Sequence, residues 1–249
     1  MSGISPNLIK CIKIFLFITN KAENDSIYLE TGLGQGISIT DIYNNFKFKE
    51  IISIELDKQK IDKVKPKVKD KNNISIIHGD SAFKLKEIYN RNINILFLDA
   101  HGIYPGIEQD KISPLENEIK FITEDVSEDQ LIIIDDFIKI KNSFLFKNKF
   151  DWRSHLKFSK FKQLIHGKGF QTLEIFYGNG NNSYYLLTKN KKFKITKKLF
   201  FINLIYRFLT IKFYIRYLKF WILAFIKKII VSLFSENFFL KIKKFIIKK

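Results

Sequence analysis

Short β-branched runs alternate with polar, helix-like segments from residue 25 to residue 189. This alternation predicts βαβ units, in which helices cover both faces of a parallel sheet. The central runs, at residues 51–54, 95–98 and 131–134, are almost entirely apolar, which is typical of strands buried on both faces. The seven strands that the pattern predicts span residues 26–30, 50–56, 73–78, 92–99, 130–135, 171–177 and 183–188.

The last two predicted strands are separated only by Gly and Asn residues, at positions 178–182. This connection is too short for a crossover helix, so the two strands should be antiparallel. Before them, Ser113, Pro114 and Glu116 form a helix-start signal, and the helix is expected to run to about Val126. The predicted fold class is therefore α/β: a doubly wound, mostly parallel seven-stranded sheet with an antiparallel C-terminal hairpin.

The net charge of +18 is unevenly distributed along the chain. Residues 191–249 hold 16 Lys or Arg against one acid, Glu236, whereas residues 1–190 hold 27 basic and 24 acidic residues. We therefore expect three parts: an N-terminal lead-in helix within residues 1–24, the α/β domain at 25–190 and a basic helical tail at 191–249. The single cysteine, Cys11, excludes an intramolecular disulfide and indicates a reducing compartment.

The first predicted strand ends at Glu30 and leads through three alternating glycines, Gly32, Gly34 and Gly36, into a helix that contains Ser38. Glycines let a backbone approach a ligand closely, but dinucleotide-binding domains also use such a turn. Here Ile37 stands where the dinucleotide motif requires its third glycine. An acid before the turn also suits a cationic amino group better than a pyrophosphate.

Acids also follow the next two strands. Glu55 comes at the end of the second strand, where a carboxylate can accept hydrogen bonds from both ribose hydroxyls. Asp80 and Ser81 follow the third strand and are suited to the edge of an adenine. Ligands in open α/β sheets collect at these carboxyl ends. The three clusters should therefore lie around one site.

This ordered set of motifs resembles that of class I S-adenosylmethionine (SAM)-dependent methyltransferases, over about residues 25–189. The resemblance implies that SAM is the cofactor and that the fold has seven strands. It implies contacts of Glu30 and the glycines with the methionine part, of Glu55 with the ribose, and of Asp80 and Ser81 with the adenine. The alternatives are a NAD-binding domain and an inactive relative. The candidate cofactor-binding residues are Glu30, Gly32, Gly34, Gly36, Ser38, Glu55, Asp80, Ser81 and Asp99.

Three further carboxylates, Asp99, Asp135 and Asp136, follow the fourth and fifth strands, and together they would suit Mg²⁺. This arrangement is similar to metal-dependent catechol-type O-methyltransferases, although Asp136 replaces the asparagine of that family. His101 stands near the position of that family's catalytic lysine, so the candidate catalytic residues are Asp99 and His101. Alternatively, Asp99 only orients the cofactor, Asp136 caps a helix and His101 binds a loop.

The tail from residue 199 is densely apolar but repeatedly interrupted by Lys and Arg. In the latter half of residues 199–234 the longest uncharged stretch, residues 220–226, is far shorter than the roughly 20 residues that a membrane span needs. We expect two amphipathic helices that lie in a membrane interface, with a break near Thr210 and a basic end at residues 241–249. Nucleic acid, a protein partner and the α/β domain itself are the alternative contacts of this tail.

The leading functional hypothesis is an O-methyltransferase at the inner, cytoplasmic face of a bacterial membrane. It would act on a small-molecule, glycan or lipid-linked acceptor, and residues 199–249 would bind the membrane surface peripherally. The alternatives are a nucleic-acid methyltransferase and a non-catalytic scaffold.

Overall fold

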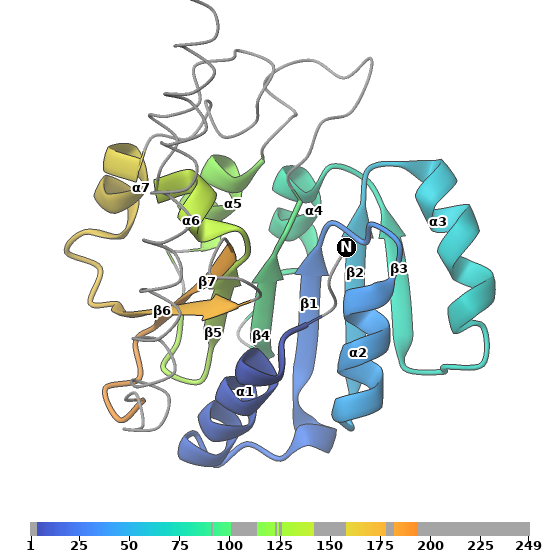
Figure 1. Cartoon of the computed structure of the whole chain (residues 1–249), viewed down its shortest axis with the longest axis horizontal. Coiled ribbons are helices and arrows are strands. Elements are labelled where there is room, and N and C mark those ends of the chain that lie inside the picture. Colours follow the sequence, from blue (N-terminus) through green and yellow to red (C-terminus); the bar gives the residue numbers. More distant parts are fainter. Residues whose placement is uncertain are drawn as a thin grey trace, which may run out of the picture.

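The computed structural model describes residues 4–90, 92–100, 114–122, 124, 126–141, 158–177 and 182–193. One seven-stranded sheet runs through this part of the chain in the order β3-β2-β1-β4-β5-β7-β6 (Figure 1). The first five strands pair in parallel, and β7 pairs antiparallel to both β5 and β6, which confirms the predicted fold class. The strands are β1 Ile27–Thr31, β2 Glu50–Glu55, β3 Ile74–His78, β4 Ile93–Leu98, β5 Leu131–Ile134, β6 Gln171–Tyr177 and β7 Asn182–Thr188.

Helices cover both faces of the sheet. The hydrophobic core of one face takes residues from α1, α2 and α3, and that of the other face takes residues from α4, α5, α6 and α7. In Figure 1, α1 and α2 lie in front of the sheet, and α4 lies behind it. The helices are α1 Pro6–Ile18, α2 Ile37–Asn45, α3 Lys58–Val64, α4 Ser81–Ile88, α5 Leu115–Ile122, α6 Phe137–Lys141 and α7 Phe158–Ile165, with short 3₁₀ turns η1 Glu23–Asp25 and η2 Lys65–Val68.

The predicted lead-in helix is α1. Ser5 caps it by accepting a hydrogen bond from Leu8 N at 3.3 Å, and Pro6 occupies the first turn, where no partner for a backbone N–H is needed. Its buried residues recur at helical spacing and pack against the sheet. They are Leu8, Cys11, Ile12, Phe15 and Leu16.

Two hydrogen bonds tie the segment before α1 to distant elements. Ile4 N donates to Asp41 Oδ2 in α2 at 2.9 Å, and Ser5 N donates to the hydroxyl of Tyr184 in β7 at 3.3 Å. The beginning of the described chain therefore bridges α2 and the C-terminal hairpin.

The helix predicted from Ser113 to about Val126 is α5, which ends earlier, at Ile122. Ser113 lies outside the described residues. The part of the predicted helix around Val126 is not helical, and next to it Ser127 N donates to the side-chain oxygen of Gln130 at 2.8 Å. The periodicity of apolar residues does not report this capture of the backbone by a side chain.

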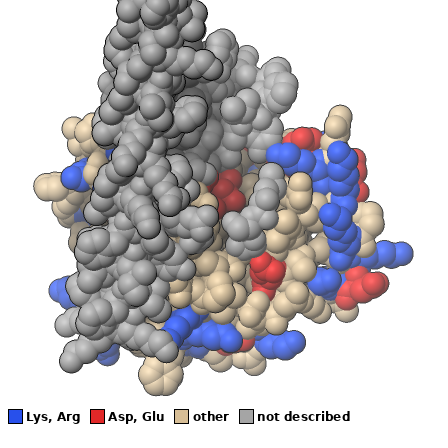
Figure 2. All heavy atoms as spheres, viewed as in Figure 1, with Lys and Arg blue, Asp and Glu red and all other residues tan. Residues whose placement is uncertain are grey.

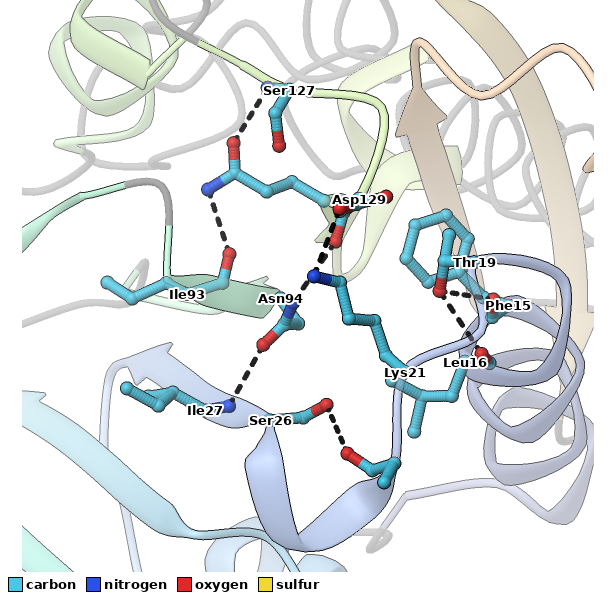
Figure 3. A network of polar contacts seen from close by, with 12 residues as sticks. Phe15, Leu16, Thr19, Lys21, Ser26, Ile27, Ile93, Asn94, Ser127 and Asp129 are labelled. Atoms are coloured by element: carbon cyan, nitrogen blue, oxygen red, sulfur yellow. Dashed lines mark hydrogen bonds and ion pairs between the residues drawn. The ribbon is translucent and has the colours of Figure 1, made fainter.

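Gln130 forms the centre of a polar network at the amino ends of the strands, part of which is drawn in Figure 3. It is 2% exposed, and its amide nitrogen donates to the backbone oxygens of Asn90 and Ile93 at 3.1 and 2.8 Å. Its oxygen accepts hydrogen bonds from Ser127 N and the Tyr89 hydroxyl. One side chain therefore joins β4, β5 and the end of α4.

We predict that Gln130→Leu lowers the free energy of unfolding by about 3 kcal/mol, because buried backbone groups lose their partners. The neighbouring change Asp129→Asn should cost under about 1 kcal/mol, since it removes only the half-exposed ion pair with Lys21. Urea unfolding followed by circular dichroism measures both, and equal losses would contradict the prediction.

Candidate functional site

The carboxyl ends of the parallel strands are held together one residue beyond the strands themselves. Here backbone hydrogen bonds continue the sheet ladder into the loops, so the loops begin from one rigid edge. The four bonds run from Gly32 N to Ile54 O, Gly79 N to Glu55 O, Asp99 N to Thr31 O and Asp135 N to Leu98 O, at 2.8 to 3.1 Å.

A cavity lies at this edge and contains about 320 Å³ of empty space, part of it open to solvent. It brings together four of the predicted cofactor-binding residues: Gly32, Glu55, Asp80 and Ser81. The strand ends that the sequence places far apart therefore meet around one space. The full lining is Gly32, Ile54, Glu55, Leu56, Gly79, Asp80, Ser81, Ala100 and Pro114.

Glu55 joins the end of β2 to the glycine-rich loop. One carboxylate oxygen accepts a hydrogen bond from Gly34 N at 3.0 Å, and the other accepts from Asp57 N at 2.9 Å. Lys60 Nζ lies 3.9 Å from the second oxygen. Glu55 itself is only 2% exposed. The carboxylate is thus fixed at the cavity wall by backbone donors. Its contact with a ribose stays a prediction.

Asp80 and Ser81 form the start of α4. Asp80 caps the helix, since its Oδ1 accepts a hydrogen bond from Ala82 N at 2.9 Å, and Ser81 is its first residue. Sequence reasoning assigned both residues to the adenine and did not foresee the cap. The cap orients the Asp80 side chain, and the adenine contact stays a prediction.

Two of the three glycines, Gly32 and Gly36, are required by the packing of the protein itself. A Cβ at Gly32, where φ is +87°, would lie 2.5 Å from the backbone oxygen of Asp99. One at Gly36, where φ is +76°, would lie 2.5 Å from Val64 Cγ1. At these two glycines the structure shows a close approach between neighbouring chain segments, and their contact with a ligand stays a prediction.

Glu30 lies beneath the glycine-rich loop with no exposed surface, and it is not part of the cavity lining. Its oxygens accept hydrogen bonds from Ser53 Oγ at 2.8 Å and from the Tyr28 hydroxyl at 3.3 Å. Burial raises the pKa of this carboxyl to about 7, although hydrogen bonds from Ser38, Ser53 and Tyr28 oppose the shift. Glu30 therefore ties β1 to β2 and to the start of α2, and its contact with a cofactor amino group stays a prediction.

At the ends of β4 and β5, Asp99, Asp135 and Asp136 are all half-buried. The Tyr177 hydroxyl donates to Asp135 Oδ1 at 2.6 Å, and Asp136 N donates to the same oxygen at 2.7 Å. Burial, followed by the charge of Asp135, raises the pKa of Tyr177 far above its ordinary value, so this tyrosine keeps its proton. Asp136 has a left-handed backbone with φ of +51°.

The comparison with families by sequence finds no match, and no curated protein matches either. Solved structures do match.

A caffeoyl-CoA O-methyltransferase-like protein from Staphylococcus aureus has a TM-score of 0.54 at 15% identity, over 74% of this chain and 84% of the other. A methyltransferase-like protein from Streptococcus mutans, in complex with SAH, has a TM-score of 0.50 at 14% identity, over 74% and 98%. An S-adenosylmethionine-dependent methyltransferase from Clostridium acetobutylicum has a TM-score of 0.50 at 12% identity, over 73% and 90%.

The chain has the class I SAM-dependent methyltransferase fold. Its strand order agrees with this result, because β7 is antiparallel and lies between β5 and β6. The NAD-binding alternative implies the strand order 3-2-1-4-5-6 of a doubly wound dinucleotide-binding sheet, which has no such strand.

Within this class I fold, the predicted Mg²⁺ site at Asp99, Asp135 and Asp136 is not supported. Among the described residues no group of three or more His, Cys, Asp or Glu side chains could hold a metal ion. One oxygen of Asp135 already accepts two hydrogen bonds, one of them from Tyr177. The Asp-Asp pair is held by a tyrosine and the backbone instead.

Sequence reasoning missed Tyr177 in β6 and Tyr184 in β7, the two strands of the C-terminal hairpin. Their rings stack with centroids 4.2 Å apart, and Tyr184 also contacts the ring of Phe97. Only the pairing of β7 with β5 brings them beside the strand-end carboxylates, and this pairing is not visible in the residue types.

The remaining predictions lie outside the described residues: the catalytic role of His101 and the amphipathic tail at residues 199–249. In the part of the chain that the structure describes, no helix is both long enough and apolar enough to span a bilayer.

We predict that Gly32→Ala lowers the free energy of unfolding by about 3 kcal/mol, because a methyl group would collide with the backbone of Asp99 in a left-handed conformation. Gly34 is the matched control: its φ is +56°, and an added Cβ would meet nothing within 4 Å. Gly34→Ala should cost only about 1 kcal/mol. If urea unfolding gives the same loss for both, the close approach at Gly32 is not the constraint.

Glu30 should make stability depend on pH. Its pKa is raised from 4.5 to about 7, so the folded protein favours the neutral carboxyl. The resulting stability is fully present below pH 4.5 and is lost as the pH rises to about 7, by about 3 kcal/mol.

Urea unfolding at pH 4.5 and at pH 7 measures this change in the free energy of unfolding. The Glu30→Gln variant should not show it. Glu50 lies at the other end of β2 and accepts an exposed hydrogen bond from Ser75, so Glu50→Gln should keep the wild-type dependence. Parallel curves for wild type and Glu30→Gln would refute the assignment.

Proposed function

We propose that this chain is a SAM-dependent methyltransferase that binds SAM across the carboxyl ends of β1, β2 and β3. The observation that carries the proposal is the shared cavity, in which Gly32, Glu55, Asp80 and Ser81 converge from three different strand ends. The SAM-dependent enzyme from Clostridium acetobutylicum and the SAH complex from Streptococcus mutans, which have the same fold, support this proposal.

Each residue would perform a distinct task. The carboxylate of Glu55, fixed by Gly34 N and Asp57 N, would accept hydrogen bonds from the ribose hydroxyls. Asp80 and Ser81, at the start of α4, would contact the adenine. The methionine part would lie against the loop of Gly32, Gly34 and Gly36 and near Ser38.

Glu30 would act on the same part of the cofactor through its charge. The pKa of the Glu30 carboxyl is about 7, so a nearby cationic amino group would favour its ionised form. Because Glu30 contacts Ser53 and Tyr28, this interaction would pass through the buried network below the loop.

SAM, when bound, supplies a methyl group already activated for transfer. The protein's part is to align an acceptor oxygen with that group and to take its proton. Asp99 and His101, after β4, remain our candidates for these roles. Tyr177 holds Asp135, which follows the neighbouring strand β5, by a hydrogen bond of 2.6 Å.

The acceptor that we propose carries a hydroxyl: a small molecule, a glycan or a lipid-linked precursor. The O-methyltransferase description of the Staphylococcus aureus protein supports O-methylation. The tail supports a site at the inner face of a membrane, because residues 191–249 combine many apolar and aromatic residues with 16 Lys or Arg.

A nucleic-acid methyltransferase is the second candidate, favoured by the same basic charge. Its binding to nucleic acid should weaken steeply with salt, and it should not bind vesicles. A non-catalytic scaffold is the third candidate, and calorimetry with SAM separates it from an enzyme.

Isothermal titration of the full chain with SAM tests the proposal. We expect binding to the wild type and about 30-fold weaker binding to Glu55→Gln, which loses charge-assisted hydrogen bonds to the ribose. The control Glu50→Gln makes the same change in the same strand, far from the cavity, and should bind as the wild type.

Melting curves of both variants show whether each remains folded. No heat with the wild type would reject the SAM-binding enzyme. Equal affinity of the wild type and Glu55→Gln would reject the ribose role.

A further inference from the structure

The outward face of α1 combines basic and apolar side chains. Lys10, Lys13 and Phe17 are exposed and lie three and four residues apart, so they share one side of the helix. Phe17 is 86% exposed, and Phe83 of α4 is the only other large apolar residue of the described chain that is similarly exposed. We call Lys10, Lys13 and Phe17 the outer face of α1.

No acid balances the charge of this face. The helix Pro6–Ile18 contains no Asp or Glu, and within the described residues neither Lys10 nor Lys13 forms an ion pair. Lys13 Nζ lies 5.4 Å from the ring centroid of Phe46, a contact that holds the lysine stem on the protein surface. Both lysines nevertheless remain exposed to solvent.

The basic tail begins beside the same helix. Phe193, the last described residue, packs edge-to-face on Phe15 of α1, with ring centroids 5.5 Å apart. The 56 residues that follow contain 14 Lys or Arg, ten Phe and a single acid. The outer face of α1 and the tail share one composition: cationic and aromatic, almost without acids.

We propose that the outer face of α1 binds an anionic lipid bilayer, with Lys10 and Lys13 at the headgroups and Phe17 in the interface. Each basic residue near an anionic leaflet adds attraction, and a phenylalanine gains free energy when it leaves water. This inference rests on the membrane part of the proposed function and not on methyl transfer.

The direction of α1 suits such a contact. The helix begins beside the start of β7, where Ser5 N meets the Tyr184 hydroxyl, and it ends beside Phe193, just after β7. Figure 1 shows α1 in front of the lower half of the sheet, away from the edge at which β1, β2 and β3 end. A bilayer against the outer face of α1 would not cover the cavity, whose lining contains no residue of α1.

A second basic region serves as a control. Lys63, Lys65, Lys67 and Lys69, in and after α3, are exposed, and Figure 2 shows basic side chains along that edge of the molecule. No strongly exposed phenylalanine accompanies them. This region has charge without a residue to insert, so it separates general attraction from specific docking.

A fluorescent probe tests the insertion of Phe17 directly. Burial raises the pKa of the Cys11 thiol to about 12, so a thiol-reactive dye should label only an introduced cysteine. Phe17→Cys and Phe83→Cys, each in the full chain and labelled with an environment-sensitive dye, are mixed with phosphatidylcholine vesicles that contain roughly one third phosphatidylserine. We expect a blue shift at position 17 and none at position 83.

Vesicle co-sedimentation tests the charge. The double variant Lys10→Gln/Lys13→Gln should bind these vesicles about 30-fold more weakly, since each lysine near the surface contributes about 1 kcal/mol. The double variant Lys63→Gln/Lys67→Gln should stay within about twofold of the wild type.

Unchanged binding of the α1 variant, or the same dye response at positions 17 and 83, would overturn the proposal even if the tail still binds vesicles. Binding to duplex RNA without binding to vesicles would also overturn it. Titration with SAM on the same preparations reports the proposed enzyme function separately.

Discussion

The contact between the β1 and β4 ends is the constraint on which the whole carboxyl edge depends. Gly32 approaches the backbone of Asp99 more closely than any side chain allows, and Asp99 N donates to Thr31 O at 3.0 Å. The loops after these two strands therefore leave the sheet at fixed positions. The cavity, the acidic strand ends and the start of α2 all take their places from this contact.

Two glutamates near this edge lie in very different surroundings. Glu55 meets two backbone N–H groups and a lysine at the cavity wall, whereas Glu30 lies below the loop among hydroxyl groups. Backbone donors and a cation favour a charged carboxylate, while burial favours a neutral one. The same residue type thus provides a fixed acceptor at the cavity wall and a buried link between strands whose carboxyl has a raised pKa.

Much of the fold was predictable from the sequence because the signals are local. The β-branched runs place all seven strands to within a residue or two, since strands buried on both faces must be continuously apolar. The antiparallel hairpin follows from its short connection. The predicted end of α5 was wrong by about a turn, because hydrophobic periodicity does not report hydrogen bonds such as that from Ser127 N to the side chain of Gln130 just beyond the helix.

The candidate site was predictable in position but only partly in detail. Strand-end residues such as Glu55 and Asp80 had to meet, because parallel strands finish at one edge. The hydrogen bond of Tyr177 to Asp135 was not foreseeable, because it joins strands that are neighbours only through the sheet order. The Mg²⁺ prediction is not supported, and a count of carboxylates does not show that one oxygen of Asp135 already accepts hydrogen bonds from Tyr177 and Asp136 N.

The bonds of Ile4 to Asp41 and of Ser5 to Tyr184 have a mechanical consequence. They join segments up to 179 positions apart, so the residues just before α1 are held to α2 and to the β6–β7 hairpin. Fraying at the N-terminus would release Tyr184 and loosen the hairpin at the same moment. The two termini of the α/β domain should consequently be lost together under proteolysis, as one cooperative unit.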